Sequence, residues 1–435
     1  MQILFESWLR NWDEAWYGEI IKNMAVNGHG WLMPYWNGRD YFDHPPLYFW
    51  LSGLVVKLFG LGEWQVRIIS VIVGIAATGL VYLIGEKLGN KATGVWASLI
   101  WLTLGQVVVR ISHGNLEGLV VMLSLAVIYL YLQKRIIMAG IVLGLGFLVK
   151  GWLLGLVPML FLASYEVYTK RRLSIRQFLT IGFMAVGVFG LWLVPAAIKF
   201  GWPVVQRYVF NPEAGRLSQA GTMFSWKFFE YLIRDVGWWW IAVVGGFILM
   251  GKLKSVTPLL VTAGVYIMAV SFLNEKSDWY LIPVYPLVAL AIGQIVARWR
   301  QKWPKMAVAA VAIIVPLQVW QVYKIEIKYP DRSRVGAELG QWVKGKVPKS
   351  GTLILDDHDF TSFLFYSNQE MVYVMERAEK KPDEWWRLKY EELPNLVKEK
   401  GQVWLVTPDL VHAPQGLTVE TLQVFNGYKL AKLTF

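Results

Sequence analysis

The chain alternates between long runs of apolar residues and short polar segments. About ten of these runs approach the roughly 20 residues that an α-helix needs to cross a bilayer. They lie at approximately 64–86, 92–110, 116–133, 136–150, 152–169, 176–199, 235–251, 256–273, 279–297 and 306–324. The pattern therefore predicts a polytopic α-helical membrane bundle of about ten spans.

Two apolar stretches before residue 64 do not fit a span. Residues 45–60 are short, begin with two prolines and carry Lys57, which predicts a helix lying in or dipping into the outer interface. From Asp13 onward the pattern is that of an amphipathic interfacial helix, whose lipid-facing side is expected to hold Ala15, Tyr17, Ile20, Ile21 and Met24. No signal peptide or span precedes this outer segment, so we expect a first helix to be missing upstream.

Basic residues fall in every second loop between the apolar runs. These loops contain Lys87 and Lys91, Lys134 and Arg135, Lys170 to Arg176, Lys252 and Lys254, and Arg298 to Lys305. By the positive-inside rule they are cytoplasmic. The other loops, including 1–63, 200–234 and the chain after about 325, are then expected outside.

The chain changes character after about residue 325. Short runs typical of β-strands occur at 352–355, 372–374 and 403–406, and 389–400 has the pattern of a charged helix. We therefore expect three parts: an outer loop with interfacial helices (1–63), a transmembrane helical domain (64–324) and a small soluble extracytoplasmic α/β domain (325–435).

Composition supports the membrane interpretation. Of the 435 residues 55% are hydrophobic and only 17% charged, whereas soluble domains are nearer a quarter charged. The net charge of +12 belongs to the membrane part, because the tail is almost neutral, so a nucleic-acid partner is excluded. Cysteine is absent, which excludes disulfides, a thiol nucleophile and cysteine metal sites.

Polar residues of the predicted outer face are the candidates for chemistry. The acids are Asp13, Glu14, Asp43 and Glu117, and the cations are Arg67, Lys150 and Lys276. Together they suit a reaction in which an acid deprotonates an acceptor hydroxyl and cations stabilise a phosphate leaving group.

Each of these features also has a plain structural explanation. An acidic pair at a helix start complements the helix dipole, and a basic residue at a membrane edge is often an anchor. An acid beside a histidine, as at Asp43 and His44, could bind a metal or contact phosphate, but is usually a solvated turn.

Longer motifs sharpen the choice. The run DEAWYGEIIKNMAVNGHGWLMPYWNGRDYFDHPPLYFWLSGLVVKLFG, followed by EWQVRIISVIVG, resembles glycosyltransferase family 39 and the aminoarabinose transferase group, which are membrane enzymes of the GT-C superfamily related to protein O-mannosyltransferases. Two further matches are LGLGFLVKG, which contains Lys150, and EKSDWYLIPVYPLVAL. His44 departs from the lysine that is commoner in the family at that position.

The resemblance implies an inverting glycosyltransferase of the cytoplasmic (inner) membrane. Such an enzyme moves one sugar from a polyprenyl-phosphate donor to a hydroxyl of a protein, lipid or cell-surface glycan on the extracytoplasmic face. It implies that Asp13 is the base with Glu14 beside it, and that Glu117 is a second loop acid. The family's phosphate-side positions correspond to Tyr41, Asp43, His44, Lys276 and Tyr280, and a divalent metal at Asp43 and His44 is the one cofactor expected.

Two other classes of membrane protein fit the sequence less well. A transporter or flippase would also carry outward polar clusters, but such proteins commonly show inverted repeats and midplane charges, and this sequence has no matching halves. A structural or sensory membrane protein would leave the acidic pair and the Asp-His-Pro-Pro run unexplained.

Overall fold

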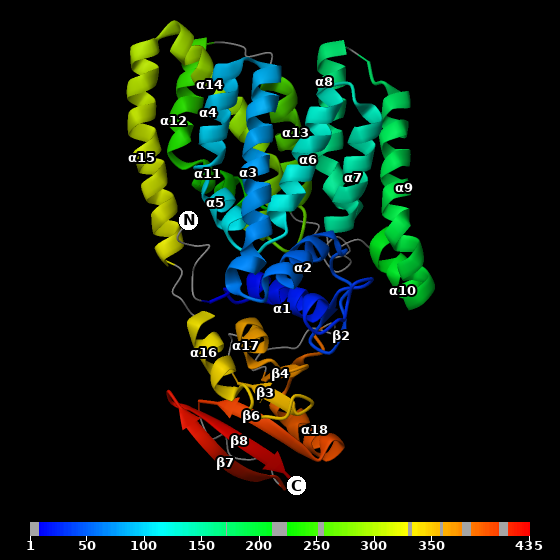
Figure 1. The fold of residues 1–435 in the computed structure, drawn as a ribbon. Coiled ribbons are helices and arrows are strands. Elements are labelled where there is room, and N and C mark those ends of the chain that lie inside the picture. The colour runs from blue at the N-terminus through cyan, green and yellow to red at the C-terminus, as the bar shows by residue number, and fades with distance from the viewer. Residues whose placement is uncertain are drawn as a thin grey trace.

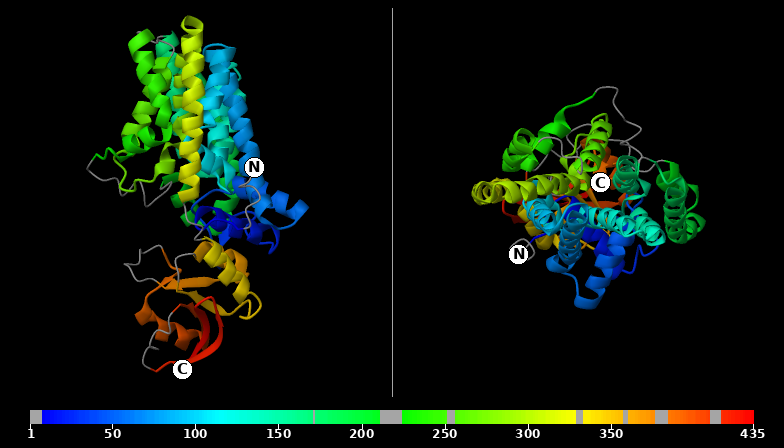
Figure 2. Two further views of the ribbon diagram at one scale, coloured as in Figure 1. Left: turned by 90° about the vertical axis from the view of Figure 1, so that its left-hand side faces the viewer. Right: turned by 90° about the horizontal axis from the view of Figure 1, so that it is seen from above.

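The computed structural model describes residues 8–170, 172–210, 224–250, 256–328, 333–356, 360–375, 384–408 and 416–435. Its helices form a long bundle, and a sheet-containing part lies at one end of that bundle (Figures 1 and 2). The connections α3–α4, α6–α7, α8–α9 and α14–α15 lie at the opposite end (Figure 1). The predicted basic loops within the described residues therefore gather at one end of the bundle.

The N-terminal segment packs across the end of the bundle that faces the sheet. It contains α1 (Asp13–Ala25), a hairpin of β1 (Tyr35–Trp36) and β2 (Arg39–Asp40), and α2 (Leu47–Phe59). The hairpin turn uses Asn37 and Gly38, both with positive φ (49° and 84°), as a two-residue turn requires. The short helix predicted within 45–60 is therefore present as α2.

One prediction about α1 is wrong. Its apolar residues Ala15, Tyr17, Ile20, Ile21 and Met24 are at most 6% exposed, so they do not face lipid. They are covered because α1 packs between α2 on one side and α17 (Phe360–Ser367) on the other. An amphipathic pattern identifies the face that is buried, but not the partner that buries it.

Within the described residues, the bundle contains thirteen α-helices, α3 to α15, and shorter helical turns. They are α3 (Glu63–Leu88), α4 (Lys91–Trp101), α5 (Gly105–Ser112), α6 (Glu117–Leu132), α7 (Ile136–Lys150), α8 (Leu156–Lys170), α9 (Ile175–Phe200), α10 (Trp202–Val205), α11 (Lys227–Val236), α12 (Trp240–Met250), α13 (Thr257–Val270), α14 (Tyr285–Lys302) and α15 (Pro304–Lys328), of which α5, α10 and α11 are short pieces at the end near α1. Helical turns η2 (Trp152–Gly155), η4 (Gly237–Trp239) and η6 (Asp278–Val284) join some of them.

The predicted number of spans is not confirmed. Within the described residues, 5 helices are long and apolar enough to cross a membrane, or 6 if the pair α4 and α5 is one span bent by 75°. Helices α6, α7 and α13 are apolar but shorter than the length required. The run predicted at 92–110 as one helix is the bent pair, and the structure also breaks the 235–251 run at η4.

Small residues let neighbouring helices approach closely. A Cβ added at Gly144 of α7 would lie 2.7 Å from the carbonyl oxygen of Ala185 in α9, and one at Gly293 of α14 would lie 2.7 Å from the amide nitrogen of Ala97 in α4. Such contacts are typical of membrane helix pairs, which associate through backbone proximity rather than through the hydrophobic effect.

The C-terminal part contains a six-stranded sheet with the order β5-β4-β3-β6-β8-β7. Strands β3 (Thr352–Leu355), β4 (Val372–Met375), β5 (Arg387–Leu388) and β6 (Gln402–Thr407) are parallel, and the hairpin β7 (Thr418–Phe425) and β8 (Tyr428–Thr434) is antiparallel. Three helices accompany it: α16 (Ser333–Val343), α17 and α18 (Leu393–Lys400). The predicted α/β module and its strands β3, β4 and β6 are confirmed.

Two features of this part differ from the sequence prediction. The charged helix expected at 389–400 is a short turn, Tyr390–Glu392, followed by α18. Helix α17 and the β7–β8 hairpin were not predicted; every residue of α17 is buried, so its sequence FTSFLFYS has no polar face to mark a helix. Helix α15 runs on to Lys328, past the boundary placed at 324, and the division into three domains stays a prediction.

Candidate functional site

Asp13 is the first residue of α1 and forms an ion pair with a cation of α5. Its Oδ2 lies 2.7 Å from Arg110 Nη1, and the Arg110 guanidinium lies 4.7 Å from the ring centre of Trp279. The side chain of Asp13 is 42% exposed, whereas that of Arg110 is 14% exposed. Asp13 is therefore a carboxylate that is fixed by one cation and still open to a substrate.

Glu14, the next residue, is enclosed in the core. Arg67 Nε donates to Glu14 Oε1 (2.8 Å) and Arg67 Nη2 donates to Glu14 Oε2 (3.1 Å). The backbone N–H groups of Gly114 and Arg10 donate to the same two oxygens at 2.8 and 2.7 Å. Arg67 is fully buried, and its Nη2 also donates to the Trp8 carbonyl at 2.6 Å. This pair joins α1 to α3 and leaves neither Glu14 oxygen open to a substrate proton.

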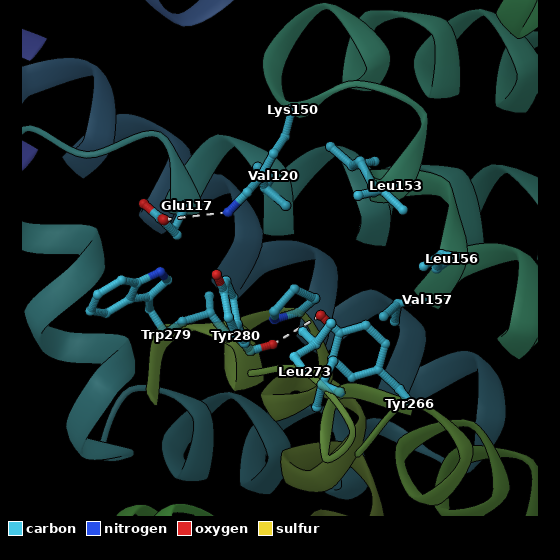
Figure 3. Close-up of a pocket in the computed structure, with 14 residues that line it drawn as sticks. Glu117, Val120, Lys150, Leu153, Leu156, Val157, Tyr266, Leu273, Trp279 and Tyr280 are labelled. Carbon is cyan, nitrogen blue, oxygen red and sulfur yellow. Dashed lines mark hydrogen bonds and ion pairs between the residues drawn. The ribbon is translucent and has the colours of Figure 1, made fainter. Parts of the chain in front are cut away.

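A cavity of about 100 Å³ lies at the end of the bundle nearest α1. It is lined by Glu117 at the start of α6, Lys150 at the end of α7, and apolar residues of η2, α8, α13 and η6. Figure 3 shows Lys150 reaching toward Glu117, with Trp279 and Tyr280 on the other side of the space. Lys150 Nζ lies 3.6 Å from Glu117 Oε1, and Glu117 Oε2 is buried with no hydrogen-bond partner among the described residues. An apolar cavity with one cation and one acid is suited to the phosphate end of a lipid.

Two buried tyrosines, Tyr17 and Tyr41, lie within electrostatic range of the acids. Burial raises the pKa of Tyr17, and the nearby carboxylates of Asp13 and Glu117 raise it further. Burial likewise raises the pKa of Tyr41, and the carboxylates of Asp43 and Asp13 add to the effect. A negative charge on either tyrosine would be disfavoured by burial and by these carboxylates, so both phenols stay protonated. Asp13 and Glu117 thus share the surroundings of Tyr17, and Asp13 and Asp43 those of Tyr41, while a single site formed by the three acids stays a prediction.

Asp43 is paired with a cation that sequence reasoning missed. Arg207 Nη2 lies 2.6 Å from Asp43 Oδ1, and Arg207 Nε donates to the Phe42 carbonyl at 3.2 Å. Tyr208 O–H donates to the His44 carbonyl at 3.4 Å, and the His44 ring lies 6.1 Å from that of Tyr41. The available signal was a basic residue in the 200–234 loop, on the side where the positive-inside rule expects few.

The metal prediction finds no donor set in the described part of the chain. No group of three or more His, Asp or Glu side chains within those residues could hold a metal ion. The carboxylate of Asp43 is paired with Arg207, so Asp43 and His44 do not by themselves fit a divalent ion. No chemical step is derived through a metal, and metal binding by these two residues stays a prediction.

Lys276 and Tyr280 come from the same segment but have different environments. Lys276 Nζ donates to the carbonyls of Ser271 (2.9 Å) and Leu273, at the C-terminal end of α13. Tyr280 lines the cavity, and its carbonyl accepts a hydrogen bond from Tyr266 O–H at 3.0 Å. Of the two, Tyr280 is the one that the structure places at the cavity.

The Trp279 segment is fixed by polar contacts that the sequence did not reveal. Asp278 Oδ2 accepts hydrogen bonds from Gln106 Nε2 (2.7 Å) and Arg234 Nη2 (2.9 Å). Arg234 Nε also lies 2.8 Å from Asp235 Oδ1. These contacts hold η6 against α5 and so keep Trp279 beside Arg110.

The fold is similar to those of two solved proteins, an ArnT and an oligosaccharyltransferase. The chain aligns over 99% of its length with 96% of ArnT from Cupriavidus metallidurans bound to undecaprenyl phosphate, with a TM-score of 0.79 and 16% identity. The oligosaccharyltransferase of Archaeoglobus fulgidus in the apo form matches 93% of the chain and 67% of its own, with a TM-score of 0.55 and 13% identity. At these identities the likeness concerns the fold.

Comparisons of the amino-acid sequence find relatives of the same kind. Residues 43–198 match the family described as dolichyl-phosphate-mannose-protein mannosyltransferase. Undecaprenyl phosphate-α-4-amino-4-deoxy-L-arabinose arabinosyl transferase 1 of Pseudomonas fluorescens (strain Pf0-1) is 25% identical over 309 residues, which is 66% of this chain and 54% of that protein. The chain thus spans about half the length of the curated relatives that it matches first. The resemblance to glycosyltransferase family 39 and the aminoarabinose transferases is confirmed.

Proposed function

We propose that the protein transfers one sugar, with inversion, from a polyprenyl-phosphate donor to an acceptor hydroxyl. The observation that carries the proposal is the apolar cavity that contains Lys150 and Glu117 and is lined by Trp279, whose ring contacts Arg110 of the Asp13–Arg110 pair. The fold is shared with an ArnT bound to undecaprenyl phosphate, which supports a lipid phosphate as the carrier of the donor sugar. The first relatives' names make a 4-amino-4-deoxy-arabinosyl donor the first to test.

The proposed reaction uses the exposed acid as the base. Asp13 accepts the proton of the acceptor hydroxyl while the acceptor oxygen bonds to the anomeric carbon. The bond from that carbon to the phosphate oxygen breaks, and the electron pair leaves with the polyprenyl phosphate. Arg110 and Lys150 stabilise the negative charge on the phosphate. We assign Glu14 and Arg67 a structural role instead, because their charges satisfy each other in the core.

The function is tested with the purified protein and polyprenyl-phosphate sugars. The donors are the 4-amino-4-deoxy-arabinosyl and mannosyl forms, incubated with an envelope lipid and glycan extract as acceptor. Mass spectrometry is expected to show free polyprenyl phosphate together with an acceptor that has gained one sugar. Movement of an intact donor between leaflets of a vesicle without sugar transfer would favour the transporter alternative and contradict the proposal.

Lys150 is expected to govern the affinity for the lipid phosphate. Replacing Lys150 by methionine removes the cation from the cavity, so the Kd for undecaprenyl phosphate should rise about tenfold or more, because charge-assisted hydrogen bonds contribute about 1.5–3 kcal/mol. Lys150→Arg should recover most of the affinity. Binding is measured by isothermal titration in detergent, with Lys57→Met on α2 as the matched control. Unchanged binding in Lys150→Met would remove Lys150 from the phosphate site.

We further propose that the bundle end bearing α1, the cavity and the sheet faces outside the cytoplasmic membrane. The support is the collection of basic loops at the other end. Because the chain has no native cysteine, single cysteines report sidedness directly. In spheroplasts, a membrane-impermeant thiol reagent should label Ser225→Cys from outside and Arg172→Cys only after lysis. The reverse pattern would overturn this orientation.

A further inference from the structure

The first turn of α1 is fixed only in part by its own segment, in which Ala15 N–H donates to the Arg10 carbonyl at 3.0 Å and Arg10 N–H donates to Glu14 Oε2 at 2.7 Å. The helix has no side-chain N-cap, and its N-cap residue Trp12 has φ 67° and ψ −124°. A bulky residue rarely adopts a positive φ, and such a conformation persists only where surrounding contacts hold it. Asp13 follows Trp12 directly, so whatever holds Trp12 also sets the position of the Asp13 carboxylate.

The contacts that hold Trp12 come from α17, nearly 350 residues later in the chain. Trp12 N–H donates to Thr361 Oγ1 at 2.5 Å. Asn11 Oδ1 accepts hydrogen bonds from Thr361 N–H (3.0 Å), Thr361 O–H (2.7 Å) and Ser362 N–H (3.3 Å). Asn11 therefore acts as the N-cap of α17 from a distant segment, since the free N–H groups of a helix's first turn are the ones that a capping side chain satisfies. Thr361 is 1% exposed, so water does not compete for these bonds.

We propose that Thr361 is a positioning residue for Asp13 and that the C-terminal part of the chain thereby belongs to the framework of the active site. On one side of Asp13, Glu14 is fixed by the helical bundle through Arg67. On the other side, Asn11 and Trp12 are fixed by Thr361. This inference rests on the proposed function, because it takes Asp13 as the base.

Close packing between α1 and α17 makes the arrangement rigid. Gly18 of α1 lies so near Phe365 that an added Cβ would be 3.3 Å from its ring, and Lys22 Nζ donates to the Phe365 carbonyl at 3.0 Å. Displacing a reacting group by about 1 Å can cost about 10²-fold in rate. Loosening the Thr361 contacts should therefore act on the rate of the chemical step while leaving the donor site in the bundle intact.

The experiment compares Thr361→Val with Thr361→Ser in the full-length protein. Valine has nearly the same shape as threonine but lacks the hydroxyl group. Serine retains the hydroxyl group. We expect kcat of Thr361→Val to fall at least tenfold, with the KM for the polyprenyl-phosphate donor within about threefold of the wild type, and Thr361→Ser to retain most of kcat. Hydrogen–deuterium exchange should become faster at residues 12–16 in the valine variant, whether or not sugar transfer is observed.

Tyr366→Phe is the matched control on the same helix. Tyr366 O–H accepts from Leu9 N–H (2.9 Å) and donates to Glu63 (2.8 Å), so its loss weakens docking of α17 without touching Trp12. Equal losses of kcat in both variants, or unchanged exchange at 12–16 in Thr361→Val, would overturn the proposal. If the wild type transfers no sugar, or Asp13→Asn remains active, the proposed function fails, while the exchange experiment still decides whether Thr361 holds the start of α1.

Discussion

Replacing Asp13 by asparagine is expected to lower kcat for sugar transfer by about 10³-fold, within the 10²–10⁴-fold that a general base contributes. Asparagine has nearly the same shape as aspartate but cannot accept the proton of the acceptor hydroxyl. The side chain is 42% exposed, and Arg110 keeps its contact with the Trp279 ring when the carboxylate is lost, so folding should change little. Single-turnover transfer of a radiolabelled sugar from its polyprenyl phosphate measures the effect.

Asp40→Asn supplies the control for this experiment. Asp40 lies at the exposed end of the β1–β2 hairpin and loses the same charge without touching Arg110. Near-normal turnover in Asp13→Asn would remove Asp13 from the role of base. Glu117 would then be the acid to examine next, because it lines the cavity and its Oε2 has no hydrogen-bond partner in the part of the chain that the structure describes.

Replacing Arg67 by methionine is expected to destabilise the fold by about 3–5 kcal/mol, because it leaves the Glu14 carboxylate buried and unpaired. The double variant Arg67→Met, Glu14→Gln should recover part of this loss, since it removes the orphaned charge as well. Thermal unfolding in detergent measures both. Arg334→Met is the control, because Arg334 pairs with Glu338 at the surface, where its side chain is 64% exposed, and its loss should cost no more than about 1 kcal/mol. An Arg67→Met protein as stable as this control would show that the pair does not hold α1.

The same pair predicts a response to acid. Burial alone would raise the pKa of Glu14, but the charges of Arg67 and His113 and the hydrogen bonds from Arg67 and Gly114 outweigh it and lower the pKa from 4.5 to about 2. A carboxyl whose pKa is lower in the folded state stabilises the fold above its unfolded pKa. This stabilisation should therefore be complete above about pH 4.5 and disappear as the pH falls toward 2. The pH dependence should be absent in the double variant.

Asp13 and Glu14 are adjacent carboxylates, and their different roles could not be predicted from the sequence. Asp13 and Glu14 are equivalent by composition, and the motif predicted that both belong to the site. Successive residues of an α-helix are turned by about 100° from one another, so one acid faces the opening and the other enters the core. Glu14 is the buried acid because it is bound by Arg67 of α3 and by the Gly114 N–H in the turn before α6. These two residues are distant from Glu14 in the sequence.

The fold, too, has features that the sequence predicts and features that depend on tertiary contacts. Long apolar runs and strand-like runs were sufficient to predict the bundle and the α/β part, because hydrophobic periodicity is a local property. The break between α4 and α5 was not predictable from WLTLG, since this stretch contains no proline and stays apolar through the turn. The cations Arg207 and Arg234 were missed because Asp43 and Asp278, the acids that they contact across the fold, lie far from them in the sequence.

The break between α4 and α5 affects where the proposed lipid carrier would place its head group. If α4 continued straight, the rise of 1.5 Å per residue would place Arg110 roughly 13 Å farther along the helix axis from Trp101. The chain instead bends by 75°, and the Arg110 guanidinium lies 4.7 Å from the ring centre of Trp279, a residue that lines the cavity. Withdrawing a chain from the hydrocarbon costs about 0.8 kcal/mol for each methylene. A carrier could therefore present its head group at Arg110 while its isoprenoid tail stays dissolved among the acyl chains.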